Sequence, residues 1–204
     1  LDQGEACDDG NLNASDGCDM CVRTAWTATT AVGTEKAATQ APLADPHGLA
    51  IDGQGRVFVA DTLNHRVMRV ETDGSITKIA GTGTPGFSGD GAVATSAELQ
   101  APSAVAVDGL GRVLVADTGN NRIRLIDLDG TISTIAGTGV GGFSGDGGPA
   151  LLAQLANPHG IAVDGLGHVL IADSDNNRIR WIDIDGTIAT IAGNGIADYT
   201  GDGG

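Results

Sequence analysis

Basic residues, cysteine and long apolar runs are all scarce in this sequence. With 11 basic against 26 acidic residues the formal net charge is −15, which repels phosphate backbones and anionic lipid, so we expect no unaided binding to nucleic acid or membrane surfaces. No apolar run of membrane-spanning length is present, so the sequence predicts no membrane insertion. All three cysteines lie within the first 21 residues, which excludes a cysteine nucleophile from the remainder.

Internal repetition dominates the rest of the chain. The stretch beginning PHGLAIDGQGRVFVADT at Pro46 recurs at Pro102 and again at Pro158. His47, Ser103 and His159 are therefore equivalent positions, 56 residues apart. Three copies in strict register predict an array of identical structural units.

Each copy carries the pattern of four short antiparallel strands. In the first copy these are Gly48–Ile51, Val57–Ala60, Arg66–Val70 and Ile76–Ala80, separated by turns rich in Asp and Gly. Four such strands make one blade of a β-propeller. The sequence therefore predicts an all-β propeller with three blades, at 46–101, 102–157 and 158–204.

A fourth-strand pattern also precedes the first blade. The segment 24–45 contains Thr27–Thr34, which aligns with Thr131–Thr138 but lacks the three strands that come before it. Such an orphan outer strand closes a propeller by completing the last blade from the other end of the chain. We therefore expect this sequence to be part of a ring of about six blades. The alternative is self-association, in which two copies close the ring together.

The connections between blades are long and rich in Gly, Ser and Asp. AVATSAELQ within the first connection has the composition of one or two helical turns. One aromatic residue occupies the same place in each connection, and we expect it to anchor the loop to a blade rather than to stack on a ligand. These aromatic residues are Phe87, Phe143 and Tyr199.

The stretch AVDGLGRVLVADTGNNRIR, from Ala106 to Arg124, resembles the NHL repeat family. The family is named after an Asn-His-Leu triplet. In this chain the triplet corresponds to Asn64-His65-Arg66 and its equivalents in the later copies. The IAGTGxxGFSGDG extension is similar to the bacterial and teneurin-like branch of that family, which has long loops between blades. This resemblance covers residues 46–204 and implies a propeller.

The first 23 residues, including GEACDDGNLNASDGCDMCVR, are similar to a short cysteine-rich repeat of bacterial secreted and surface proteins. That resemblance implies disulfide-bonded cysteines and an extracellular or cell-surface location. A spacing of two residues between Cys18 and Cys21, where three are common, leaves the pairing of Cys7, Cys18 and Cys21 open.

Two metal hypotheses concern this amino-terminal module. A reduced Cys-x-x-Cys with Cys7 would suit zinc, but no fourth ligand is evident. Oxygen ligands surround the cysteines and are the type that calcium prefers, although turn formation explains the same residues without an ion. The candidate calcium ligands are Asp8, Asp9, Asn11 and Asp16.

His47 and His159 are the candidates for an enzymatic site. Each stands at the start of a first strand, two blades apart. In propeller lyases that release amidated peptides, histidines at alternating blades resemble this placement and hold an axial zinc ion. The competing interpretation is structural, because Pro-His-Gly at this point is also common in non-catalytic NHL propellers.

Acidic and basic residues also repeat in every blade, with an Arg five positions after an Asp. We expect each pair to tie strands or blades together, because a charge repeated in every blade indicates architecture rather than chemistry. The pairs are Asp61 with Arg66, Asp117 with Arg122 and Asp173 with Arg178.

The sequence therefore favours a non-catalytic extracellular scaffold that binds a protein or glycan on a propeller face, where loops from several blades converge. The alternative is a metal-dependent lyase-like or lactonase-like enzyme using His47 and His159. The first interpretation requires no cofactor, and calcium in the amino-terminal module is the one candidate.

Overall fold

The computed structural model describes residues 37–198. The chain divides into two compact units, Leu1–Thr30 and Ala31–Gly204, and the description concerns the second. The cysteine-rich module, the orphan strand at Thr27–Thr34, Tyr199 and the candidate calcium ligands lie outside the described residues. No helix within residues 37–198 is long and apolar enough to cross a membrane.

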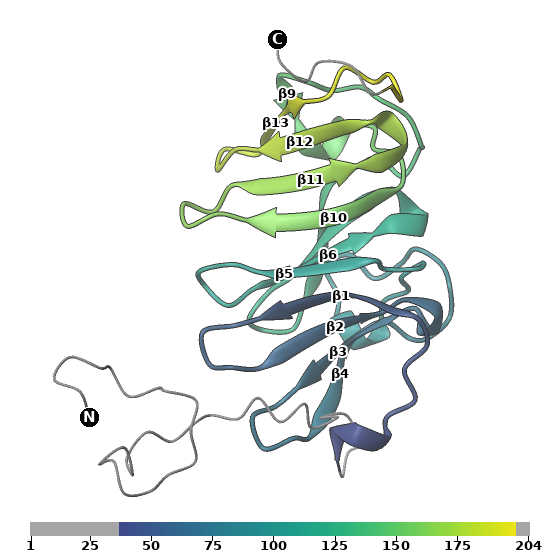
Figure 1. Cartoon of the computed structure of the whole chain (residues 1–204), viewed down its shortest axis with the longest axis vertical. Coiled ribbons are helices and arrows are strands. Elements are labelled where there is room, and N and C mark those ends of the chain that lie inside the picture. Colours follow the sequence, from purple (N-terminus) through teal and green to yellow (C-terminus); the bar gives the residue numbers. More distant parts are fainter. Residues whose placement is uncertain (1–36, 199–204) are drawn as a thin grey trace, which may run out of the picture. The chain divides into compact units, whose positions relative to one another are not determined.

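Three antiparallel sheets follow one another along the chain, as the sequence predicts (Figure 1). In each sheet four strands lie side by side in sequence order, which is the arrangement of a propeller blade. Blade 1 contains β1 (Pro46–Ile51), β2 (Val57–Asp61), β3 (Arg66–Val70) and β4 (Ile76–Ala80). Blade 2 contains β5 (Ala104–Val107), β6 (Val113–Asp117), β7 (Arg122–Ile126) and β8 (Ile132–Ala136). Blade 3 contains β10 (Pro158–Val163), β11 (Val169–Asp173), β12 (Arg178–Ile182) and β13 (Thr187–Ala192).

Short 3-10 helices occupy the loops. One precedes blade 1, one follows the second strand of every blade, and one lies in each of the two connections between blades. The helical turn predicted for AVATSAELQ is one of these, a single 3-10 turn at Ala94–Ser96. They are η1 (Ala38–Gln40), η2 (Thr62–Asn64), η3 (Ala94–Ser96), η4 (Thr118–Asn120), η5 (Ala150–Leu152) and η6 (Ser174–Asn176).

The hairpin turns are made by Asp and Gly. In blade 1 the amide of Gly55 donates to the carbonyl of Asp52 at 3.0 Å, and Gly55 has φ +79°. A left-handed residue at this point is the usual reason for glycine in a tight turn. The Asp52 carboxylate accepts from the amides of Gln54 and Arg56, which fixes the turn from within.

Neighbouring blades pack closely at their first strands. A Cβ atom on Gly48 of β1 would lie 2.5 Å from the Cα of Ala104 on β5, so only glycine fits there. This contact explains the small residues that the sequence places in first strands. Apolar residues fill the space between blades, with Phe58 of blade 1 and Val115 of blade 2 in one buried cluster.

Each connection between blades runs along the outer strand of the blade that follows it. In the first connection the amide of Gly91 donates to the carbonyl of Ile132, and that of Ala94 donates to the carbonyl of Gly130. In the second, the two-residue strand β9 (Gly148–Pro149) pairs with β13. The long connections therefore cover the outer edges of blades 2 and 3, which would otherwise expose unpaired strand groups.

The outward flank of blade 1 differs from the equivalent surface of blade 2. Leu49 is 67% exposed, whereas Val105 at the same repeat position is 4% exposed because blade 1 covers it. Blade 1 thus keeps an apolar flank exposed to solvent. The prediction of six blades stays a prediction.

Candidate functional site

The sheet edge at which β1, β5 and β10 begin carries the predicted histidines, and we call it the start edge. Ser103 occupies the equivalent position in blade 2, where it is buried. Its hydroxyl donates to the carbonyl of His159 at 2.9 Å, and its oxygen lies within hydrogen-bonding distance of the Thr118 hydroxyl. Ser103, which stands in blade 2 where blades 1 and 3 have histidine, therefore joins blade 2 to blade 3.

Both histidines are exposed to solvent. Nε2 of His47 lies 3.2 Å from Oδ1 of Asp45, in a pair whose side chains are both about half exposed. Within residues 37–198, no group of three His, Cys, Asp or Glu side chains is arranged to hold a metal ion. His47 and His159 are thus available to solvent, and a zinc site built from them stays a prediction.

Threonine hydroxyls link successive blades at the start edge. Thr62 donates to the carbonyl of Pro102 at 2.8 Å, and Thr118 donates to the carbonyl of Pro158 at 2.7 Å. Both threonines follow a second strand and bond the residue that opens the next blade. The residues that open blades 2 and 3 are therefore each held by the preceding blade.

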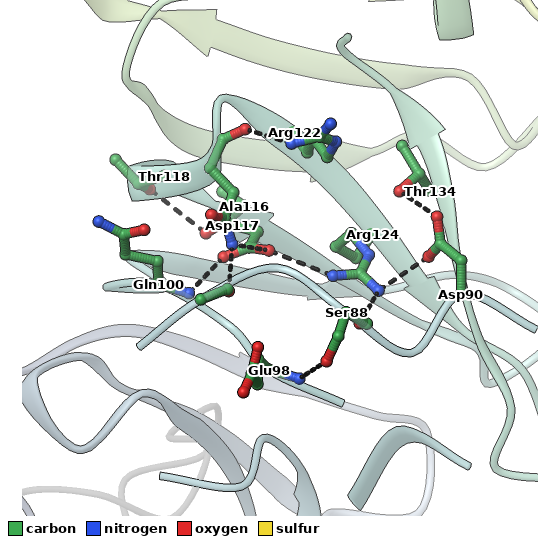
Figure 2. A network of polar contacts seen from close by, with 12 residues as sticks. Ser88, Asp90, Glu98, Gln100, Ala116, Asp117, Thr118, Arg122, Arg124 and Thr134 are labelled. Carbon is green, nitrogen blue, oxygen red and sulfur yellow. Dashed lines mark hydrogen bonds and ion pairs between the residues drawn. The ribbon is translucent and has the colours of Figure 1, made fainter. Parts of the chain in front are cut away.

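A network of charges around the buried Arg124 joins blade 2 to the connection that precedes it (Figure 2). The guanidinium of Arg124 is fully buried and bonds Oδ2 of Asp117 at 3.3 Å and Oδ1 of Asp90 at 2.8 Å. It also donates to the carbonyl of Ser88 at 3.1 Å. Asp90 in turn accepts from the hydroxyl of Thr134 at 2.7 Å. Ser88 and Asp90 belong to the connection that leaves blade 1, so one arginine holds that connection against blade 2.

The carboxylate of Asp117 is buried and accepts several hydrogen bonds. The backbone amide of Gln100 donates to Oδ1, while the amide of the Asn120 side chain and Arg124 donate to Oδ2. Burial raises the pKa of Asp117 above its usual value, because desolvation outweighs these favourable contacts.

Blade 3 repeats the same network. Arg180 bonds Asp173 at 3.2 Å and Asp146 at 2.8 Å, and Asn176 donates to both Asp173 and the carbonyl of Gly142. Repetition in a second blade favours a structural role for these charges. The sequence also predicts a structural role for Asp173, but with Arg178 and not Arg180 as its partner.

The predicted pairing of Asp with the Arg five positions later is correct in blade 1 and wrong in blades 2 and 3. Nε of Arg66 lies 2.6 Å from Oδ2 of Asp61. In blade 2 the partner of Asp117 is Arg124, seven positions later. Blade 1 has Met68 at the position of Arg124, so Arg66 pairs with the buried carboxylate there.

Arg122 and Arg178 have another function. The guanidinium carbon of Arg122 lies 3.7 Å from the ring centroid of Phe87, and Arg178 lies 3.8 Å from that of Phe143. The ring of Phe87 also faces Arg124, at 4.8 Å. Phe87 and Phe143 therefore anchor their connections as predicted, although through cation–π contacts and with about 40% of Phe87 exposed.

The opposite edge carries the turns that join β1 to β2 and β3 to β4 and their equivalents, and we call it the turn edge. In blade 3 His168 replaces the arginine of the other blades, with Nδ1 2.7 Å from Oδ2 of Asp164 and Nε2 3.5 Å from Oδ1 of Asp183. The hydrogen bond from His168 lowers the pKa of Asp164 to about 2. His168 also meets Trp181 in an edge-to-face contact.

A cavity of about 410 Å³ lies between blades 1 and 2 near the turn edge. Its volume falls within the range of small-molecule sites. Two of its cations already have partners, since Arg56 pairs with Asp52 and Arg69 pairs with Glu71. Its lining includes Arg56, Phe58, Arg69, Lys78, Ile126 and Leu128.

Comparisons with known proteins identify the repeats. A family model described as NHL repeat matches residues 43–68, 99–124 and 155–182. Protein SUPPRESSOR OF QUENCHING 1, chloroplastic, of Arabidopsis thaliana is 31% identical over 152 residues, covering 69% of this chain and 14% of that protein. Teneurin-1 of Mus musculus is 38% identical over 104 residues, covering 45% of this chain and 4% of that protein.

A solved structure of a streptogramin B lyase has the same fold, with a TM-score of 0.53 at 18% identity. The match covers 74% of this chain and 41% of that one. The chain thus spans less than half of that structure and a small part of the two relatives, so these similarities establish the repeat and the propeller fold alone.

Proposed function

The chain carries three NHL repeats folded as propeller blades, and from this premise we propose that it is a non-catalytic scaffold that binds a protein or glycan. One observation carries the proposal. The charges that repeat in the blades are engaged in holding blades and connections together, as in the contacts of Arg124 with Asp117 and Asp90. Both edges of the blades present loops and turns to solvent, and loops on a rigid scaffold are the usual place for binding.

An extracellular or cell-surface setting is part of this proposal. Its support is the clustering of Cys7, Cys18 and Cys21 in a module separate from the blades, because disulfide-bonded modules persist in oxidising compartments. Calcium bound by Asp8, Asp9, Asn11 and Asp16 belongs to the same proposal. To test the calcium site, the melting temperature of the whole chain is measured at increasing calcium concentrations. An unchanged melting temperature would contradict the site.

The second candidate is a metal-dependent propeller enzyme. The observation in its favour is that His47 and His159 both lie exposed at the start edge, two blades apart. Two histidines and a third ligand would leave one open position for water on a zinc ion. The residues present supply two of those ligands.

Metal content separates the two candidates. We would load the chain with zinc, remove excess metal and measure the bound zinc in the unmodified protein, in H47A, in H159A and in H168R. H168R is the matched control, because arginine occupies this position in blades 1 and 2. The scaffold predicts the same low zinc content in all four proteins. Stoichiometric zinc that is lost in H47A and H159A and kept in H168R would establish the metal site and reject the scaffold.

A further inference from the structure

Four aliphatic residues at the turn edge are largely exposed to solvent. Leu110 and Leu128 of blade 2 are each 70% exposed, and Leu166 and Ile184 of blade 3 are 77% and 75% exposed. Each one sits in a hairpin turn, where polar residues are usual. We call these four residues the aliphatic tips.

The turns do not require aliphatic residues, and blade 1 shows this directly. Gln54 occupies the position of Leu110 and Leu166 in blade 1, and Thr72 that of Leu128 and Ile184. The turn closed by Gly55 in blade 1 has the same 3.0 Å hydrogen bond as the turn closed by Gly111 in blade 2. The backbone therefore folds equally well with a polar tip, and the aliphatic tips have no role within the turn.

The tips belong to one surface. A Cβ on Gly111 would lie 3.7 Å from Cδ2 of Leu128, so the two turns of blade 2 meet. Blades 2 and 3 pack against one another through a shared core cluster that includes Leu114 and Ile171. Their hairpins β5–β6 and β10–β11 project to the same side of the molecule in Figure 1. Solvated aliphatic groups gathered on one edge are typical of an interaction surface.

Carboxylates frame the tips. Asp129 and Asp185 each follow a tip directly, and hydrogen bonds from Thr131 and Thr187 lower their pKa values, so both are ionised at neutral pH. The two basic groups in these turns are already engaged, since Arg112 pairs with Asp108, and His168 contacts Asp164 and Asp183. The frame is therefore acidic, in keeping with the net charge of −15.

We propose that the aliphatic tips dock a basic amphipathic segment of a partner protein. Apolar side chains of that segment would cover the tips, while its Lys and Arg would meet the carboxylates around them. Charge complementarity selects this occupant, because an acidic frame repels both anionic lipid and a second copy of this acidic chain. The surface ends at blade 1, where Gln54 and Thr72 replace the tips. This inference rests on the proposed scaffold function and names its partner class.

The test replaces each tip by the residue that blade 1 already uses, giving L110Q/L128T/L166Q/I184T. The control, V140T/L151T/L152S, replaces three aliphatic residues that are 60%, 53% and 70% exposed in the second connection, again by the equivalents from the first. The probes are a helical peptide built from Leu and Lys and a matched peptide built from Leu and Glu. Binding is measured by calorimetry, and circular dichroism confirms that each variant is folded.

We expect the unmodified chain and the control to bind the Leu/Lys peptide and not the Leu/Glu peptide. The tip variant should bind the Leu/Lys peptide at least about tenfold more weakly. The proposal is overturned if the tip variant binds as well as the control, or if the unmodified chain does not bind. It is also overturned if the tips instead mediate binding to phosphatidylcholine vesicles. Self-association through the tips, seen as an increase in the mass of the chain with concentration, would overturn it as well. The zinc measurement stays independent, so failure of this surface is distinguishable from failure of the scaffold function.

Discussion

Arg124 in the third strand of blade 2 and Asp90 in the connection leaving blade 1 form an ion pair at 2.8 Å, with the arginine fully buried. The pair joins segments 34 residues apart and is repeated by Arg180 and Asp146 in blade 3. The stretch Gly-Phe-Ser-Gly-Asp-Gly that supplies the aspartate precedes blades 2 and 3 but not blade 1. Blade 1, which this stretch does not precede, has Met68 in place of the arginine. The arginine is therefore found in the two blades whose preceding connection supplies the aspartate.

The close approach of Gly48 to blade 2 predicts a large cost for G48A. The added Cβ would lie 2.5 Å from the backbone of Ala104, which cannot move without separating the blades. We expect unfolding free energy to fall by about 2 kcal/mol, within the range for overpacked cores. G160A is the matched control, because its Cβ would lie 3.2 Å from the Ala172 side chain, and urea denaturation compares the two. Equal costs for both variants would contradict the packing described for β1 and β5.

Ala101 adopts a left-handed conformation, with φ +46°. This conformation is costly for alanine and free for glycine. A101G keeps the amide that donates to Nδ1 of His65 at 3.0 Å. We therefore expect A101G to raise the unfolding free energy by about 0.5 kcal/mol, after allowing for the entropy of glycine in the unfolded chain. A lower melting temperature for A101G would show that the strain is absent.

The contact of His168 with Asp164 predicts a pH effect. Because the folded pKa of Asp164 is lowered to about 2, its stabilising contribution is present above the unfolded value of 3.8 and is lost as the pH falls towards 2. Carbon-detected NMR titration should give a midpoint near the lower value in the unmodified chain. In H168L the midpoint should move towards 3.8, whereas H168R should keep it low, as an arginine can still donate. An identical midpoint in H168L and the unmodified chain would refute the assignment to His168.

The repeat period was sufficient to predict the blades, their strands and the antiparallel order, because apolar alternation and Asp-Gly turns are local features. Pairing across connections was not predictable in the same way. The partner of Asp117 depends on a loop that lies beside it only after folding, so spacing favoured Arg122 over Arg124. A signal was nevertheless present, since Met68 breaks the repeat where the upstream loop differs. The pairing of β9 with β13 involves only two residues and leaves no periodicity in the sequence.

The central claim is that the repeated charges join blades rather than perform chemistry, and a double-mutant cycle on Asp90 and Arg124 tests it most directly. The unfolding free energies of the unmodified chain, D90N, R124M and D90N/R124M would be measured in urea. Any cost of leaving Asp117 unpaired cancels in the cycle, because it is common to both arginine variants. The account predicts a favourable coupling of about 1 kcal/mol or more, as for a charge-assisted hydrogen bond with one buried partner. A coupling indistinguishable from zero would contradict it.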